Sequence, residues 1–204
     1  MSLASAGLAG CASLSADECQ QADWRLIGFN DGSVGRPVSR LSEHRKACSK
    51  VGVVPEMDTY LAGHREGALR YCTAANGYAL GAQGGLDAGV CQDHDGNGFA
   101  AALAAGRQLH AVRVPVARLT AELNEHDKRL GEIDADIEHL RRDIVDRGYT
   151  ASARSGYLGE IDALQAEASE IVSRMDQLRY DLAGAEADLD RVVAEHVALG
   201  YPAQ

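Results

Sequence analysis

The sequence predicts an all-α protein in which a small, disulfide-stapled helical domain is followed by a long antiparallel coiled-coil hairpin. Sixteen of the 22 glycines and all five cysteines lie in the first 110 residues, whereas 19 of the 30 acidic residues lie after them. No two segments show the period-two alternation and hairpin turns that would indicate a sheet. We therefore expect a helical domain over residues 11–110 and a helical hairpin over residues 111–204.

The first residues resemble an export signal. Leu8-Ala9-Gly10-Cys11 is similar to the bacterial lipobox, in which a peptidase cuts before a cysteine whose thiol carries the lipid. Residues 1–10 would then be the remnant of a lipoprotein signal peptide, and Cys11 would be the lipidated residue. By resemblance to enterobacterial sorting, Ala12 favours the outer membrane, facing the periplasm. The alternative is a chance run of small residues at the start of a cytoplasmic protein.

Four helices are expected in the first domain. Ser15 and Glu18 form the S-x-x-E pattern of a capping box, which predicts a helix that runs through Trp24 toward Gly32. Further helices are expected over residues 39–50, over residues 57–72 and after Cys91.

Apart from Cys11, the chain has four cysteines, which an exported protein would join as two disulfides. In antiparallel neighbouring helices, the start of one helix meets the end of the next. Among the three possible pairings, this geometry favours Cys19–Cys48 and Cys72–Cys91. Each bridge would close a loop of about 20–30 residues and contribute roughly 3–4 kcal/mol of stability.

A glycine pattern repeats within the first domain. Residues 23–32 and 58–67 share D-x-x-L-x-G-x-x-[DE]-G, residues 76–85 form a weaker third copy, and residues 103–106 form a worn fourth. Glycine in a helix costs about 1 kcal/mol relative to alanine, so glycines four residues apart favour closely packed helices. The alternative is a binding face, which would consist of Trp24, Gly28, Asp31, Gly32, Tyr60, Gly63, His64, Glu66 and Gly67.

The cysteines, glycines and aromatic residues of this region also form one longer pattern. Its elements are Cys19, Asp23-Trp24, Gly28, Asp31-Gly32, Gly35, Cys48, Tyr60, Gly63, Gly67, Tyr71-Cys72, Cys91, Phe99 and Gly106. This pattern resembles the bacterial lipoprotein family called domain of unknown function 2799, over roughly residues 11–110. The resemblance implies a secreted, lipid-anchored domain and supplies no catalytic residues.

Calcium is a weak candidate ligand. Asp93, Asp95, Asn97 and Gly98 match the first half of an EF-hand loop, in which oxygen ligands alternate around a tight glycine turn. However, Ala104 stands where a bidentate Glu normally completes the shell. A turn that leads into the next helix explains the same residues.

Zinc is a second weak candidate. His44 and Cys48 are spaced i, i+4, and His64 and Cys72 lie nearby in the sequence. No C-x-x-C pair is present, and zinc sites usually contain one. We therefore expect no resident cofactor.

From Val112 the apolar residues follow a heptad pattern, with alternating spacings of four and three up to Ile144. A second such seam runs over residues 157–199, and residues 146–156 join the two helices. They are predicted to fold back on each other, with a first arm roughly 50 Å long. Pairing about Gly148–Thr150 would place His126 opposite Met175 as a tolerated seam residue. Both helices could instead pair with another chain.

Composition and motifs limit the function. The net charge of −10 argues against nucleic-acid binding, and no G-x-S-x-G or H-E-x-x-H motif occurs. We expect a lipid-anchored envelope protein whose coiled-coil arm contacts an envelope protein or a second copy. One alternative is an envelope-directed hydrolase that uses Asp31, His64 and Glu66. Another is a weak calcium-binding module at residues 93–98.

Overall fold

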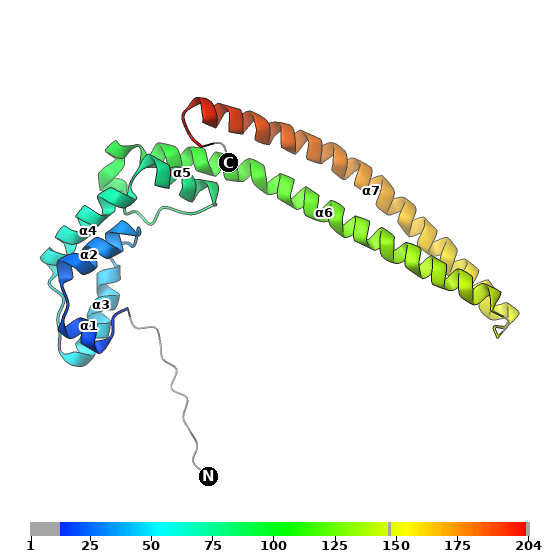
Figure 1. The fold of residues 1–204 in the computed structure, drawn as a ribbon, viewed down its shortest axis with the longest axis horizontal. Coiled ribbons are helices and arrows are strands. Elements are labelled where there is room, and N and C mark those ends of the chain that lie inside the picture. Colours follow the sequence, from blue (N-terminus) through cyan, green and yellow to red (C-terminus); the bar gives the residue numbers. More distant parts are fainter. Residues whose placement is uncertain (1–12, 147, 203–204) are drawn as a thin grey trace, which may run out of the picture. The chain divides into compact units, whose positions relative to one another are not determined.

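The computed structural model describes residues 13–146 and 148–202, and Figure 1 shows its helices. These residues form helices and no strand, so the predicted all-α class is confirmed. The predicted lipidation site Cys11 and the signal remnant at residues 1–10 lie outside the described residues. The chain divides into two compact units, residues 1–108 and 109–204, which we call the head and the arm.

The described part of the head contains five helices and the start of a sixth. These are α1 (Ala16–Gln20), α2 (Trp24–Ser33), α3 (Arg40–Cys48), α4 (Met57–Tyr71), α5 (Ala74–Ala82) and the first turns of α6 (Phe99–Val145). Two short 3-10 helices, η1 (Ser49–Val51) and η2 (Gln92–Asn97), complete it. Helix α5 was not among the predicted helices; Thr73 caps its start by accepting a hydrogen bond from the Asn76 backbone N–H.

The prediction of one helix from Ser15 to Gly32 is wrong, because two helices share this segment. The Ser15–Glu18 capping box is present, but α1 ends at Gln20. Asp23 then starts α2 with an extended backbone, and its carboxylate accepts from the backbone N–H groups of Arg25 and Leu26 at 3.0 Å each. An aspartate satisfies orphan N–H groups best at such a cap, so the chain turns there instead of continuing the helix.

Helices α2 and α4 lie side by side and pack through their glycines (Figure 1). A Cβ atom on Gly28 would lie 2.1 Å from the Tyr60 carbonyl oxygen, and one on Gly32 would lie 2.2 Å from the His64 carbonyl oxygen. Both contacts advance in the same direction along the two chains, so α2 and α4 are parallel. The repeated glycines therefore allow the two backbones to approach each other closely.

The same arrangement occurs between α5 and the first turns of α6. A Cβ atom on Gly81 would lie 2.3 Å from the Leu103 carbonyl oxygen, and one on Gly106 would lie 2.2 Å from the Tyr78 carbonyl oxygen. Thus the third and fourth copies of the repeat also pack through glycine. Gly85 follows the end of α5 and is closest to the side chain of Leu80, so it has no part in the helix contact.

The head is therefore built twice on one plan. In each half, a cysteine precedes one packing glycine by 9 residues, and a second cysteine precedes the partner of that glycine by 15 residues. The four cysteine–glycine pairs are Cys19–Gly28, Cys48–Gly63, Cys72–Gly81 and Cys91–Gly106. Each half is closed by its own disulfide, Cys19–Cys48 in the first and Cys72–Cys91 in the second, which is the pairing expected from the sequence.

The arm pairs the part of α6 that follows residue 108 with α7 (Ala151–Ala198), and the two helices run antiparallel (Figure 1). The predicted long helical hairpin is therefore confirmed. Near the turn its core consists of Ile133, Ile137, Leu140 and Ile161. The turn is shorter than predicted because Thr150 already caps α7, accepting from the Ala153 backbone N–H. Within the described residues, no helix is both long enough and apolar enough to cross a membrane.

Two ion pairs define how the helices of the arm align. Arg129 donates to both carboxylate oxygens of Glu167, at 2.7 and 2.9 Å, and Arg174 donates to one carboxylate oxygen of Glu122 at 2.8 Å. Both pairs are symmetric in sequence about residue 148. Arg129 and Glu167 each lie 19 residues from it, and Glu122 and Arg174 each lie 26 residues from it. His126 consequently lies beside Ile171, with which it lines a surface hollow, about one turn from the predicted position opposite Met175.

Candidate functional site

The head contains a buried polar cluster centred on Asp31, in the last turns of α2. The side chain of Asp31 is among the few buried charged groups of the described residues, with 8% of the residue exposed. Its Oδ2 atom lies 2.7 Å from Nε2 of His44 and accepts a hydrogen bond from the Tyr60 hydroxyl at 2.9 Å. Its Oδ1 atom lies 3.8 Å from Nε of Arg36. One carboxylate thus joins α2, α3, α4 and the segment between α2 and α3.

A glycine turn makes this arrangement possible. After α2, Gly35 adopts a φ of +72°, a left-handed conformation that other residues rarely adopt. The turn brings the Arg36 backbone N–H to the Asp31 carbonyl oxygen at 2.9 Å, and the Arg36 carbonyl oxygen lies 2.7 Å from Nε2 of His64. Both the N–H and the carbonyl group of Arg36 therefore form hydrogen bonds that hold the segment leading to α3.

His44 connects the cluster to the N-terminal segment. It lies on α3 with only 2% of its surface exposed, and its Nδ1 atom lies 2.9 Å from Oγ of Ser13. A carboxylate can only accept, so in the neutral imidazole Nε2 carries the hydrogen that is donated to Asp31. Nδ1 is then the acceptor for the Ser13 hydroxyl. Ser13, His44 and Asp31 form a continuous hydrogen-bonded chain.

A cleft of about 640 Å³ opens over this chain. Its volume is within the range of small-molecule sites. Its lining combines apolar side chains with Asp31, His44 and two guanidinium groups, and it also includes the acidic residues Asp17, Glu18 and Asp23. The lining residues used below are Ser13, Leu14, Leu26, Val34, Arg36 and Arg40.

Tyr60 contributes a hydroxyl group in an apolar setting. Burial, together with its hydrogen bond to the negative Asp31, raises the pKa of Tyr60 far above its ordinary value, because both disfavour a phenolate. Its ring lies between two imidazoles, with ring centroids 6.0 Å from His44 and 5.9 Å from His64. The neutral phenol is therefore part of the folded state.

The head is expected to lose stability as the pH rises above about 10, the unperturbed pKa of tyrosine. There the unfolded chain releases the Tyr60 proton while the folded chain retains it, so the free energy of unfolding falls with increasing pH. Urea unfolding followed by Trp24 fluorescence between pH 8 and 11 measures this slope. Tyr60→Phe should flatten the slope, and an equally steep slope in that variant would show that Tyr60 is not its source.

The second half of the head serves as an internal comparison. The two halves can be aligned on their cysteines, Cys19 with Cys72 and Cys48 with Cys91. In this alignment the positions of Asp31, Tyr60 and His64 are occupied by Gly84, Leu103 and Arg107. This half packs its two helices through glycine and is closed by a disulfide, yet it has none of these three side chains. The polar cluster is thus not a requirement of the repeated fold.

The structure does not bring together the predicted hydrolase residues Asp31, His64 and Glu66. Although His64 is buried, its Nε2 atom is bound to the Arg36 carbonyl oxygen and not to Asp31. Glu66 forms an exposed ion pair with Arg25 on the outside of α2 and α4. The side chains that do assemble around Asp31 are His44, Tyr60 and Arg36, and Ser13 joins them through His44.

The predicted glycine binding face is also not a surface. Gly28, Gly32, Gly63 and Gly67 are covered by the backbone of the opposite helix. Trp24 and Tyr60 are buried, with exposed fractions of 5% and 0%. These residues therefore position the cluster and do not form an open binding face.

The metal candidates find no support among the described side chains. Cys48 and Cys72 are disulfide-bonded, so neither is a thiolate ligand for zinc. Of the calcium candidates, Asp93 is exposed in η2, whereas the side chains of Asp95 and Asn97 lie outside the described part of the chain. No group of three or more His, Cys, Asp or Glu residues that could hold a metal occurs among the residues described.

Comparison with known proteins finds a family match in the head. The family model described as "Protein of unknown function (DUF2799)" matches residues 23–108, so this part of the chain is similar to that family. The match includes Asp31, His44 and Tyr60 but begins after Ser13. No curated protein and no solved structure matches the chain.

Proposed function

We propose that the protein is a lipid-anchored envelope protein that faces the periplasm and contacts a partner protein through its arm. The observation that carries this proposal is the pair of disulfides, whose four cysteines are buried. Such bridges form and persist in oxidising compartments and are rare in the cytosol. The lipobox-like sequence that ends at Cys11 supplies the means of anchoring the exported chain.

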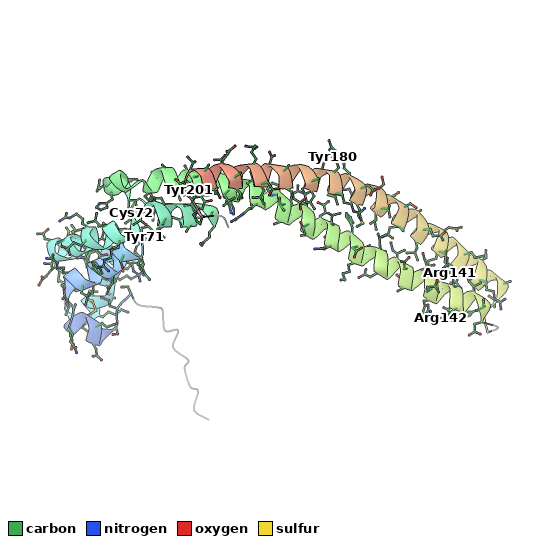
Figure 2. The ribbon with its side chains drawn as sticks, turned by 45° about the horizontal axis from the view of Figure 1, so that its top comes forward. Tyr71, Cys72, Arg141, Arg142, Tyr180 and Tyr201 are labelled. Atoms are coloured by element: carbon green, nitrogen blue, oxygen red, sulfur yellow. A yellow bond between two sulfur atoms is a disulfide. The ribbon has the colours of Figure 1, made fainter. Side chains whose placement is uncertain are left out.

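The arm offers contact surface. Its seam buries aliphatic residues, while its outer positions are mostly charged. Figure 2 shows Tyr180 projecting outward from α7, and 78% of this residue is exposed. Leu158 and Val172 on the same helix are also about half exposed. Aromatic and aliphatic side chains among charged ones are typical of the centre and rim of transient interfaces.

Export and anchoring predict the chemical state of the mature protein. Mass spectrometry of protein purified from membranes should find an acylated Cys11 as the first residue and no free thiol. Cys11→Ala should release the protein from the membrane fraction while the four other cysteines stay oxidised. A mature chain that begins with unmodified Met1 and contains free thiols would contradict both parts of the proposal.

Contact through the arm can be tested in intact cells with the full chain. A photo-crosslinking amino acid at Tyr180 should give adducts with an envelope protein, or with a second copy, distinguished by mass. The matched control is Leu86 in the head, which is 79% exposed and equally accessible to a crosslinker. Adducts from position 86 alone would assign the contact to the head and reject the arm.

A further inference from the structure

We propose that Ser13, His44 and Asp31 form a nucleophilic centre that cleaves esters of apolar acyl groups, with Ser13 as the nucleophile. This activity is separate from contact through the arm and does not depend on it. It also differs from the hydrolase predicted from the sequence, since His64 and Glu66 have no part in it.

The geometry is that of an activated hydroxyl. Oγ of Ser13 lies 2.9 Å from Nδ1 of His44, and Nε2 of the same ring lies 2.7 Å from Oδ2 of Asp31. A nucleophile within hydrogen-bond reach of a base, with that base oriented by a third group, is the arrangement by which serine nucleophiles are recognised on unrelated folds. Here the imidazole presents Nδ1 to the serine and Nε2 to the carboxylate. Either ring nitrogen can act as the base.

The base is held rigidly. His44 is nearly inaccessible, and the Tyr60 hydroxyl donates to the same Asp31 oxygen that His44 uses. Asp31 and Tyr60 are positioning residues, because they act on the substrate only through His44. Ser13 itself is partly exposed and lines the cleft, so a substrate can reach it.

The cleft indicates the substrate class. Leu26 and Val34 line it and are 54% and 61% exposed, which leaves apolar surface for an acyl chain. Arg36 and Arg40 line the same cleft, where Arg36 lies 3.8 Å from Asp31 and Arg40 pairs with Glu43. Their guanidinium groups are donors of the kind that stabilises the oxyanion formed during acyl transfer. The second half of the head, which lacks the counterparts of Asp31 and Tyr60, shows that packing alone does not demand this cluster.

In the reaction, Oγ of Ser13 attacks the ester carbonyl carbon while its proton moves to Nδ1 of His44. The bond from that carbon to the alcohol oxygen then breaks, and the leaving alcohol takes the proton from Nδ1. Water, deprotonated by the same nitrogen, attacks the acyl carbon. The bond from that carbon to Oγ of Ser13 then breaks, Nδ1 returns the proton to Oγ, and the carboxylic acid is released. One ester and one water become one acid and one alcohol, with no oxidant or reductant.

The test uses the full chain and a fluorophosphonate probe, whose phosphorus is attacked by activated serine hydroxyls with loss of fluoride. Peptide mass spectrometry should locate the probe on Ser13, and p-nitrophenyl esters of short fatty acids should be hydrolysed. Ser13→Ala should abolish labelling and lower ester hydrolysis by at least about 100-fold. The matched control is Ser42→Ala, because the exposed Ser42 hydroxyl donates to the Ser39 carbonyl oxygen and Ser42 is not among the residues that line the cleft.

The His44→Gln variant distinguishes a Ser13 hydroxyl that is activated by His44 from one that is only exposed to the probe. If His44 is the base, labelling of Ser13 should fall by at least about 100-fold in a variant whose Trp24 fluorescence remains that of the folded head. The idea fails if folded wild-type protein labels Ser13 no faster than Ser42. It also fails if Ser13 is labelled equally well with glutamine at position 44. Should the His44 variant unfold, the comparison of Ser13→Ala with Ser42→Ala still decides.

Discussion

Replacing Gly63 with alanine is expected to destabilise the head by about 3 kcal/mol or more, although only one methyl group is added. A Cβ atom at this position would lie 1.9 Å from the Arg25 carbonyl oxygen and 2.8 Å from its carbonyl carbon. These are backbone atoms inside α2, so they cannot rotate away as a side-chain end would. The two helices would have to separate, which would also displace Tyr60 from Asp31. Since small domains are stable by 5–15 kcal/mol, a large part of the stability would be lost.

The measurement benefits from the position of the single tryptophan. Trp24 is buried in the head, so denaturant unfolding followed by its fluorescence reports on the head alone. The control is Gly131→Ala in the arm, where an added Cβ would meet nothing within 4 Å. That change should leave the Trp24 transition in place and stabilise α6 by up to about 1 kcal/mol. A Gly63→Ala head as stable as wild type would show that α2 and α4 do not pack this closely.

The close helix packing and the arm are features of the fold that could be predicted from the sequence. The spacing of Gly28 and Gly32, repeated at Gly63 and Gly67, identifies helices that pack closely, and the heptads after Val112 predict the arm. In both cases a periodic sequence pattern corresponds to a contact that continues along two helices, so the contact can be predicted from the sequence. Periodicity does not determine alignment, however. The pairing of the arm about residue 148 follows from the shorter turn and from ion pairs such as Arg129–Glu167, and so His126 was misplaced by about one turn.

The site was less accessible to prediction, for a geometric reason. Asp31 was identified as a candidate residue, but its partners follow from the parallel pairing of α2 with α4, which places Tyr60 beside it and His64 one turn farther on. His44 reaches Asp31 after the chain turns at Gly35, between α2 and α3. Ser13 belongs to no helix and to no motif. The i, i+4 spacing of His44 with Cys48 draws attention to His44, but it indicates only a weak zinc candidate and not a partner of Asp31.

Reducing both disulfides is expected to unfold the head while the arm stays helical. The two bridges span 29 and 19 residues, and in the chain-entropy model each contributes about 3–4 kcal/mol. Together they approach the whole stability of a small domain. Helix α1 depends on its bridge in particular, because five residues cannot form a stable helix without tertiary contacts.

One sample contains its own control for this experiment, because all five cysteines precede residue 109 and the arm has none. With a phosphine reductant at neutral pH, the Trp24 transition should move to much lower denaturant, while helical circular dichroism should retain the contribution of α7 and the arm part of α6. Cys19→Ala with Cys48→Ala should reproduce part of the shift without reductant. If the reduced head kept its full stability, glycine packing and the Asp31 cluster alone would suffice to fold it. The disulfides would then no longer argue that the protein needs an oxidising compartment.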